Sequence, residues 1–214
     1  MRFPGPLLLF AIAPCCLAQY WDVGIAGGYG FYHNPTIKTP LGSAEAGVEN
    51  GWAAGAVLTE DVTEHFGGEL RYTYRAGDLT LSSSGTKANL NADTHTVNYD
   101  LLIYGTPRRA RVRPFAAVGG GIKNYIGTGV ENMVQPLSNF ALLTHASQIE
   151  GLVSVGGGVK FMMAHRLVLR FDFRDYMTPF PDRLFGRVPN ATQHGWLHDF
   201  VPLVGVDWVL RDAR

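Results

Sequence analysis

The chain has 214 residues, of which only 17% are charged, and 18 Lys and Arg residues balance 18 Asp and Glu residues. This length suits a single domain, and the zero net charge argues against nucleic acid as a partner, because nucleic-acid binding proteins carry a basic excess. The sequence has no apolar run of about 18 residues, so it predicts no transmembrane helix.

The first 18 residues, MRFPGPLLLFAIAPCCLA, predict a secretory signal peptide. They combine a positive charge at Arg2, a short apolar run and a small residue, Ala18, before the expected cleavage point. Alternative interpretations are a buried N-terminal strand and a lipid-modified cysteine. Both cysteines of the chain lie in this leader. The mature chain, 19–214, is therefore predicted to be one domain without a thiol for disulfides, metal binding or catalysis.

The stretch from His165 to Tyr176, HRLVLRFDFRDY, shows the pattern that the rest of the chain repeats. With a period of two, large apolar side chains point one way and charged side chains, Arg170, Asp172 and Arg174, point the other. Such a row of charges needs water or partners, because an enclosed and unpaired charge is costly. A narrow barrel in a bilayer meets this need, with lipid outside and paired charges inside.

Eight segments with this period are present, each about ten residues long, which is the length of a tilted strand that crosses a bilayer. They are 20–32, 51–59, 66–75, 95–104, the segments around the Gly-rich repeats 118–123 and 155–160, 165–176 and 200–211. Long polar connections, 33–50, 76–93, 127–148 and 178–199, alternate with short turns. In outer-membrane barrels long loops are extracellular and short turns periplasmic, so an even strand number predicts two periplasmic termini.

The inward positions of these segments collect five acids and six bases. They are Asp22, Glu69, Asp100, Asp172 and Asp207, with Arg71, Arg75, Lys123, Lys160, Arg170 and Arg174. Side chains nearly fill the bore of an eight-stranded barrel, so these charges must pair. We therefore predict a lumen plugged by ion pairs. Carboxylates surrounded by arginines stay ionised, so this network is not predicted to be catalytic.

Aromatic residues gather near the ends of the predicted strands, as in the girdles at a membrane interface. They are Trp21, Tyr29, Phe31, Trp52, Tyr72, Tyr74, Tyr104, Phe173 and Trp208. A soluble barrel would instead bury such residues and expose its charges. The pattern favours a lipid-facing outer surface.

Three stretches, RPFAAVGGG at 113–121, LVLRFDFRDY at 167–176 and VGVDWVLR at 204–211, resemble the OmpA/OmpX-like family of small eight-stranded outer-membrane β-barrels. The resemblance covers the mature chain. It implies an all-β fold, an eight-stranded antiparallel up-and-down transmembrane β-barrel, in the bacterial outer membrane of the cell envelope. It also implies outer-membrane lipid and the barrel assembly machinery as partners.

Two further patterns of residues resemble parts of catalytic or metal sites. His145 lies near Thr144 and Ser147, an arrangement similar to small barrels in which histidine activates serine to modify lipid A. His194 and His198 are spaced for a metal pair on a helical turn, but no third ligand lies nearby. Neither pattern is complete, so we predict no enzymatic activity, no cofactor and no metal.

The sequence thus predicts an outer-membrane protein with a structural or surface-interaction role, and any extracellular ligand would bind through the loops. The alternatives are a narrow, porin-like, ion-conducting pore and a lipid A-modifying barrel enzyme. The loop chemistry is generic and specifies neither a ligand nor an oligomeric state.

Overall fold

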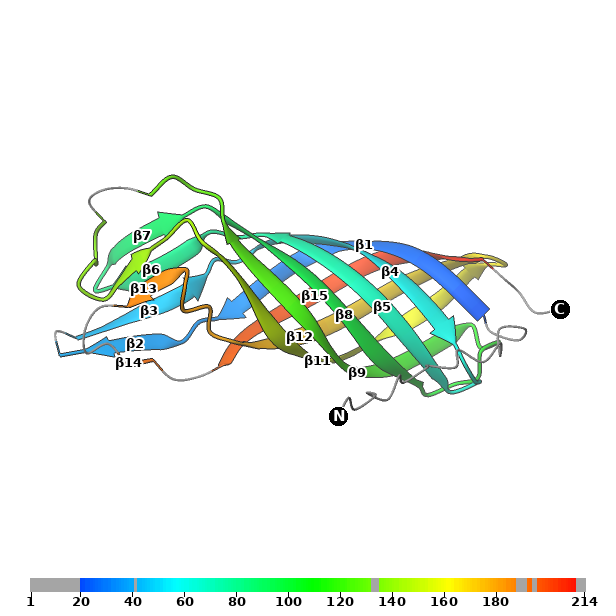
Figure 1. Cartoon of the computed structure of the whole chain (residues 1–214). Helices are drawn as coiled ribbons and strands as arrows, with labels where there is room; N and C mark the ends of the chain where they lie inside the picture. Colours follow the sequence, from blue (N-terminus) through cyan, green and yellow to red (C-terminus); the bar gives the residue numbers. More distant parts are fainter. Residues whose placement is uncertain (1–19, 41, 132–134, 188–191, 194–195, 211–214) are drawn as a thin grey trace, which may run out of the picture.

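The computed structural model describes residues 20–40, 42–131, 135–187, 192–193 and 196–210; the predicted signal peptide lies outside them. Eight long strands form a closed antiparallel barrel (Figure 1). They are β1 (Tyr20–His33), β4 (Gly51–Asp61), β5 (Phe66–Ala76), β8 (Ala92–Tyr104), β9 (Val112–Gly127), β11 (Ser147–Ala164), β12 (Leu167–Pro179) and β15 (Trp196–Val209). Barrel strands that are consecutive in sequence are neighbours in the sheet, and β15 closes on β1. The predicted fold class, an all-β, eight-stranded antiparallel up-and-down barrel, is confirmed.

No helix in these residues is long and apolar enough to cross a membrane. Most barrel strands extend beyond the predicted segments, although β12 begins at Leu167 and β15 ends at Val209, two residues inside the predicted limits. A larger difference lies at the start of β15. The sequence predicted a loop as far as Asp199, whereas the strand begins at Trp196. That part of the loop prediction was wrong because 196–199 continue the alternation. Leu197 and Asp199 are buried, while Trp196 is exposed.

The long connections between barrel strands also contain strands, which the sequence analysis described as polar loops. They are β2 (Thr36–Thr39), β3 (Gly42–Val48), β6 (Leu79–Ser83), β7 (Thr86–Leu90), β10 (Ala141–Leu143), β13 (Phe185–Arg187) and β14 (Thr192–Gln193). One sheet has the order β14-β2-β3-β6-β7, and β10 pairs with β13. We call these seven strands the cap. Figure 1 shows the cap at the end of the barrel opposite the short turns.

The cap forms because its short strands bury apolar residues against one another and against the barrel rim. The buried residues are Ile37, Ala44, Ala46, Val48, Leu79, Leu81, Ala88, Leu90, Ala92, Tyr125, Phe140, Ala141, Leu143, Phe180, Leu184, Phe185 and Leu197. Between β6 and β7, Ser84 and Gly85 have φ angles of 49° and 83°, the left-handed pair that a tight two-residue hairpin requires. The cap therefore has an apolar core of its own, which continues onto the barrel rim at Tyr125 and Leu197.

The outer surface of the barrel is apolar and exposed, and the charged residues lie inside. Outward residues of the barrel strands include Ile25, Tyr29, Trp52, Leu70, Tyr99, Leu101, Val118, Ile122, Phe171, Phe173, Val204, Val206 and Trp208. Tyr104 differs from the prediction: it is buried, with its ring 6.0 Å from that of Phe115. It lies one position beyond the outward Ile103, so the alternation turns it into the lumen.

Candidate functional site

The lumen of the barrel is the largest concentration of buried charge among the described residues. The structure places all eleven predicted charged residues inside, and the side chain of Asp22, 14% exposed, is the most open of them. Burial of so many charges is tolerable only if each has a partner. The ion pairs form three tiers along the barrel axis.

The middle tier is centred on Glu69 of β5. Its carboxylate accepts hydrogen bonds from Arg71 at 2.8 Å, from Arg174 at 3.2 Å and from Arg170. Arg71 also donates to Asp172 at 2.5 Å. Three strands separate β5 from β12 in either direction around the barrel, so the two strands face each other across the bore. Strand β12 carries Arg170, Asp172 and Arg174. These ion pairs therefore span the bore instead of following its wall.

The middle tier contains a second carboxylate, that of Asp100, which also contacts Arg174. Asp100 of β8 lies 3.2 Å from Arg174 Nε and accepts hydrogen bonds from Asn98 at 2.9 Å and Ser154 at 3.2 Å. The guanidinium groups of Arg170 and Arg174 lie 5.5 and 5.6 Å from the centre of the Phe115 ring. Hydrogen bonds and ring contacts thus hold the arginines in fixed positions, which limits the cost of their burial.

The lower tier lies near the short turns. Lys160 Nζ is 2.9 Å from Asp22 and 3.4 Å from Asp207, while Asp207 is also 3.7 Å from Arg170 of the middle tier. Asp61 accepts a hydrogen bond from Arg113 at 2.5 Å. The lower tier is therefore linked to the middle tier through Asp207.

The upper tier lies beneath the cap and is centred on Asp199. Arg75 donates to one of its carboxylate oxygens, and Lys123 donates to the other at 2.5 Å. The guanidinium of Arg75 lies 3.9 Å from the centre of the Tyr32 ring and donates to the Gly30 carbonyl at 2.7 Å. Each charge of this tier thus has a specific buried partner.

Three lumen residues, Asp61, Arg113 and Asp199, were missed by the sequence analysis, which assigned them to turns or a loop. The period-two alternation of the sequence does extend to them, because each lies an even number of positions from an inward residue of the same strand. Asp61 follows Thr59, Arg113 precedes Phe115, and Asp199 belongs to the series that ends at Asp207. With these additions, the described lumen residues of the three tiers contain seven acids and seven bases.

The two weaker patterns are not assembled into sites among the described residues. The hydroxyl of Ser147 donates to Asn124 Oδ1 at 3.0 Å, whereas the ring of His145 contacts the Gly129 carbonyl at 2.9 Å. His198 pairs with Asp175 at 2.9 Å, and its predicted partner, His194, lies outside the described residues. The part of the chain that the structure describes contains no group of three potential metal ligands.

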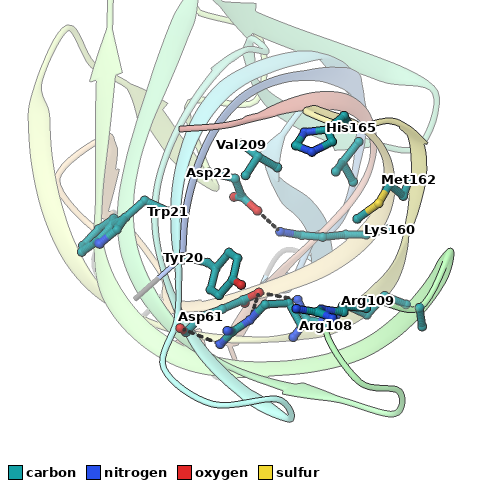
Figure 2. A pocket seen from close by; sticks show the side chains of 13 residues that line it. Tyr20, Trp21, Asp22, Asp61, Arg108, Arg109, Lys160, Met162, His165 and Val209 are labelled. Carbon is teal, nitrogen blue, oxygen red and sulfur yellow. Dashed lines mark hydrogen bonds and ion pairs between the residues drawn. The ribbon is translucent and has the colours of Figure 1, made fainter. Parts of the chain in front are cut away.

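A pocket of about 350 Å³ opens at the short-turn end of the lumen (Figure 2). Arg108 is fixed at its mouth, with its guanidinium 3.9 Å from the centre of the Tyr20 ring and hydrogen bonds at 3.1 Å to the carbonyls of Asp61 and Thr63. The backbone N–H of Arg108 donates to the Glu64 carboxylate at 2.9 Å and lowers the pKa of that exposed group. The turns around the pocket are thus held together by arginine.

Comparison with known proteins gives a likeness in structure only. The sequence matches no protein-family model and no curated protein. The outer membrane protein OprG from Pseudomonas aeruginosa is 13% identical and superposes with a TM-score of 0.60 over 91% of this chain and 98% of that chain. The outer membrane protein AlkL, at 14% identity, gives 0.51 over 100% and 99%. Neisserial surface protein A, at 11% identity, gives 0.51 over 88% and 96%.

Such identities establish the fold and leave the activity open. The closed eight-stranded sheet agrees with these neighbours over most of both chains. The chain therefore has the fold of the small eight-stranded outer-membrane β-barrels, the architecture that its sequence resembles.

Proposed function

We propose that the protein is a bacterial outer-membrane barrel with a structural or surface-interaction role and a lumen that does not conduct. The observation that carries the proposal is the middle tier. Ion pairs join β5 to β12 across the bore, and the side chains of Glu69, Arg170 and Arg174 are inaccessible to solvent. The apolar core of the cap lies beyond this tier and supports a second closure.

The proposed placement in a membrane is supported by the distribution of polar residues, which is the opposite of that in a soluble protein. An apolar outer face with a charged interior suits lipid outside, as in transmembrane β-barrels. On the cap side, the apolar face gives way to polar contacts: Tyr74 donates to Asp93 at 2.7 Å, and His198 pairs with Asp175 at 2.9 Å. We take these contacts as the boundary of the lipid-facing band.

The orientation follows from the lengths of the connections. The cap is built from the long connections and the opposite end from short turns, so we place the cap outside the cell and the termini in the periplasm. The proposed partners are outer-membrane lipid, the barrel assembly machinery and any extracellular ligand of the cap. A cap with its own apolar core presents a fixed surface, which lowers the entropic cost of binding.

A conductance measurement distinguishes a barrel with a closed lumen from an ion-conducting pore. The folded protein in a planar bilayer with concentrated potassium chloride is expected to give no unitary current steps, because charged side chains fill the bore. A general porin reconstituted in the same way is the positive control. Steady unitary steps that disappear when the lumen is chemically blocked would contradict a closed lumen and support the pore.

A further inference from the structure

The connection between β8 and β9, residues 105–111, is rich in arginine. Of its three arginines, Arg108 is held against the Tyr20 ring, whereas Arg109 and Arg111 are exposed. The turn between β11 and β12 adds a further exposed residue, Arg166. Arg109, Arg111 and Arg166 make no ion pair with any residue that the structure describes. We call these three residues the arginine rim, and the lumen network does not use their charge.

The arginine rim lies at neighbouring strand ends. Strand β11 pairs with β9 on one side and with β12 on the other. The backbone N–H of Met162 donates to the Arg111 carbonyl at 2.9 Å. The backbone N–H of Val209 in β15 donates to the Arg166 carbonyl at 3.0 Å. Figure 1 shows the short turns at the end of the barrel opposite the cap. Three exposed positive charges are therefore concentrated on one side of this end.

Acidic residues at the surface of the short-turn end do not cancel this charge. The exposed Glu64 accepts a hydrogen bond from the backbone N–H of Arg108, which lowers the pKa of its carboxyl group, and the charges of nearby arginines lower this pKa further. Glu60 accepts a hydrogen bond from the Tyr99 hydroxyl at 3.0 Å. Arg108 and the arginine rim thus set four positive charges against two carboxylates among the described surface residues. Such an excess attracts anions.

The arginine rim borders the apolar outer face of the barrel. Arg111 directly precedes Val112, which is 46% exposed. Arg166 directly precedes Leu167, the register partner of Trp208, which is 51% exposed. One residue advances a strand by only about 3.3 Å, so the backbone of these arginines lies at the margin of the surface that we assign to lipid. Flexible arginine side chains at this depth reach the headgroups of a bilayer.

The opposite margin of the apolar face has the other sign of charge. On the cap side, Asp93 accepts a hydrogen bond from the Tyr74 hydroxyl, and Asp175 pairs with His198. Both carboxylates are half-buried at outward positions of the barrel strands. Carboxylates repel anionic headgroups, whereas the unpaired arginines attract them. The two margins therefore favour lipids of different charge.

We propose that the arginine rim binds the anionic headgroups of phospholipids, such as phosphatidylglycerol, in the leaflet that contacts the short turns. A guanidinium group donates two parallel hydrogen bonds to a phosphate. A zwitterionic headgroup carries its own compensating ammonium, so its attraction to the rim is weaker. This proposal rests on the membrane placement proposed above, and it adds the class of lipid and the residues that select it.

Trp208 is a built-in reporter for the test, because its register partner follows Arg166 directly. A variant that keeps only this tryptophan, with Trp21→Phe, Trp52→Phe and Trp196→Phe, is folded into phosphatidylcholine vesicles. Brominated lipids, which quench tryptophan on contact, are then added in increasing fractions. In about 0.1 M salt, brominated phosphatidylglycerol is expected to associate about fivefold more strongly than brominated phosphatidylcholine, the effect of one arginine near its headgroup. This ratio is expected to approach one in about 1 M salt.

Variants assign the preference to the arginine rim. Arg111→Gln combined with Arg166→Gln is expected to lower the ratio to about one. Arg183→Gln, the same change at an exposed position between β12 and β13 in the cap region, is the matched control and is expected to leave the ratio unchanged. An unchanged ratio in the double variant would contradict the assignment.

A second reporter tests the opposite margin. A variant that keeps only Trp52, which is exposed on the cap side, is expected to show a ratio of about one. A preference for phosphatidylglycerol at Trp52 as strong as that at Trp208 would contradict a role for the arginine rim.

The same data separate this proposal from the membrane placement. Quenching of Trp208 by neither brominated lipid would contradict the placement itself. Equal quenching by both lipids, without an effect of salt, would keep the barrel in the membrane and overturn the selection of anionic phospholipid alone.

Discussion

Replacement of Arg170 by leucine is expected to lower the free energy of unfolding by about 3–5 kcal/mol, the usual cost of removing one partner from a buried ion pair. Arg170 is fully buried, donates to Glu69 and lies 3.5 Å from Asp172 and 3.7 Å from Asp207. Leucine fills part of the space but leaves these carboxylates with fewer positive partners. The largest loss comes from Glu69, at the centre of the bore.

Urea unfolding of the protein in lipid vesicles, followed by tryptophan fluorescence, measures this effect. Arg166→Leu is the matched control, because the same substitution is made at an exposed position close in sequence and outside the lumen tiers. We expect the control to change stability by less than about 0.5 kcal/mol. Equal stability of Arg170→Leu and Arg166→Leu would show that Arg170 is not part of a buried network.

Replacement of Gly121 by valine is expected to destabilise the barrel by about 3 kcal/mol or to prevent its assembly. A Cβ atom at this inward position would lie 2.6 Å from Asn98 Cα and collide with the Val97 carbonyl oxygen. Both are backbone atoms of the neighbouring strand β8, which cannot rotate away. The strands would have to separate locally, and overpacking of this kind is costly.

Gly151→Val is the matched control on the adjacent strand β11. Gly151 is the register partner of Ile122, faces outward, and has no atom within 4 Å of the position that a Cβ would take. The control is expected to fold like the original chain, and the yield of folded protein after dilution from urea into vesicles compares the two. Equal yields would contradict the close strand approach at Gly121.

The period-two pattern was sufficient to predict the eight strands and the inward position of residues such as Glu69 and Arg170. The reason is physical: a barrel wall between lipid and a narrow bore imposes opposite polarity on alternate residues along its length. The resemblance of three stretches to small outer-membrane barrels pointed to the same fold, which the structure confirms.

The cap was not predicted, because its strands are short and their buried residues, such as Ala44 and Ala46, are small and lie among polar neighbours. A composition-based interpretation treats such segments as loops. The pairing across the bore, such as Glu69 with Arg174, depends on which strands lie opposite and is not encoded in local spacing. Asp199 lies between these two cases. It continues the alternation of the last strand, but it directly follows a polar, Pro-rich segment and was therefore assigned to a loop.

The central claim is that this chain forms a closed barrel with its charges inside and its apolar face in the outer membrane. Gel mobility of boiled and unboiled protein, after separation of inner and outer membranes, tests this most directly. A closed barrel resists detergent because every strand is paired. We therefore predict outer-membrane protein that migrates as a compact band until it is heated. Soluble periplasmic protein with the same mobility before and after heating would contradict the account.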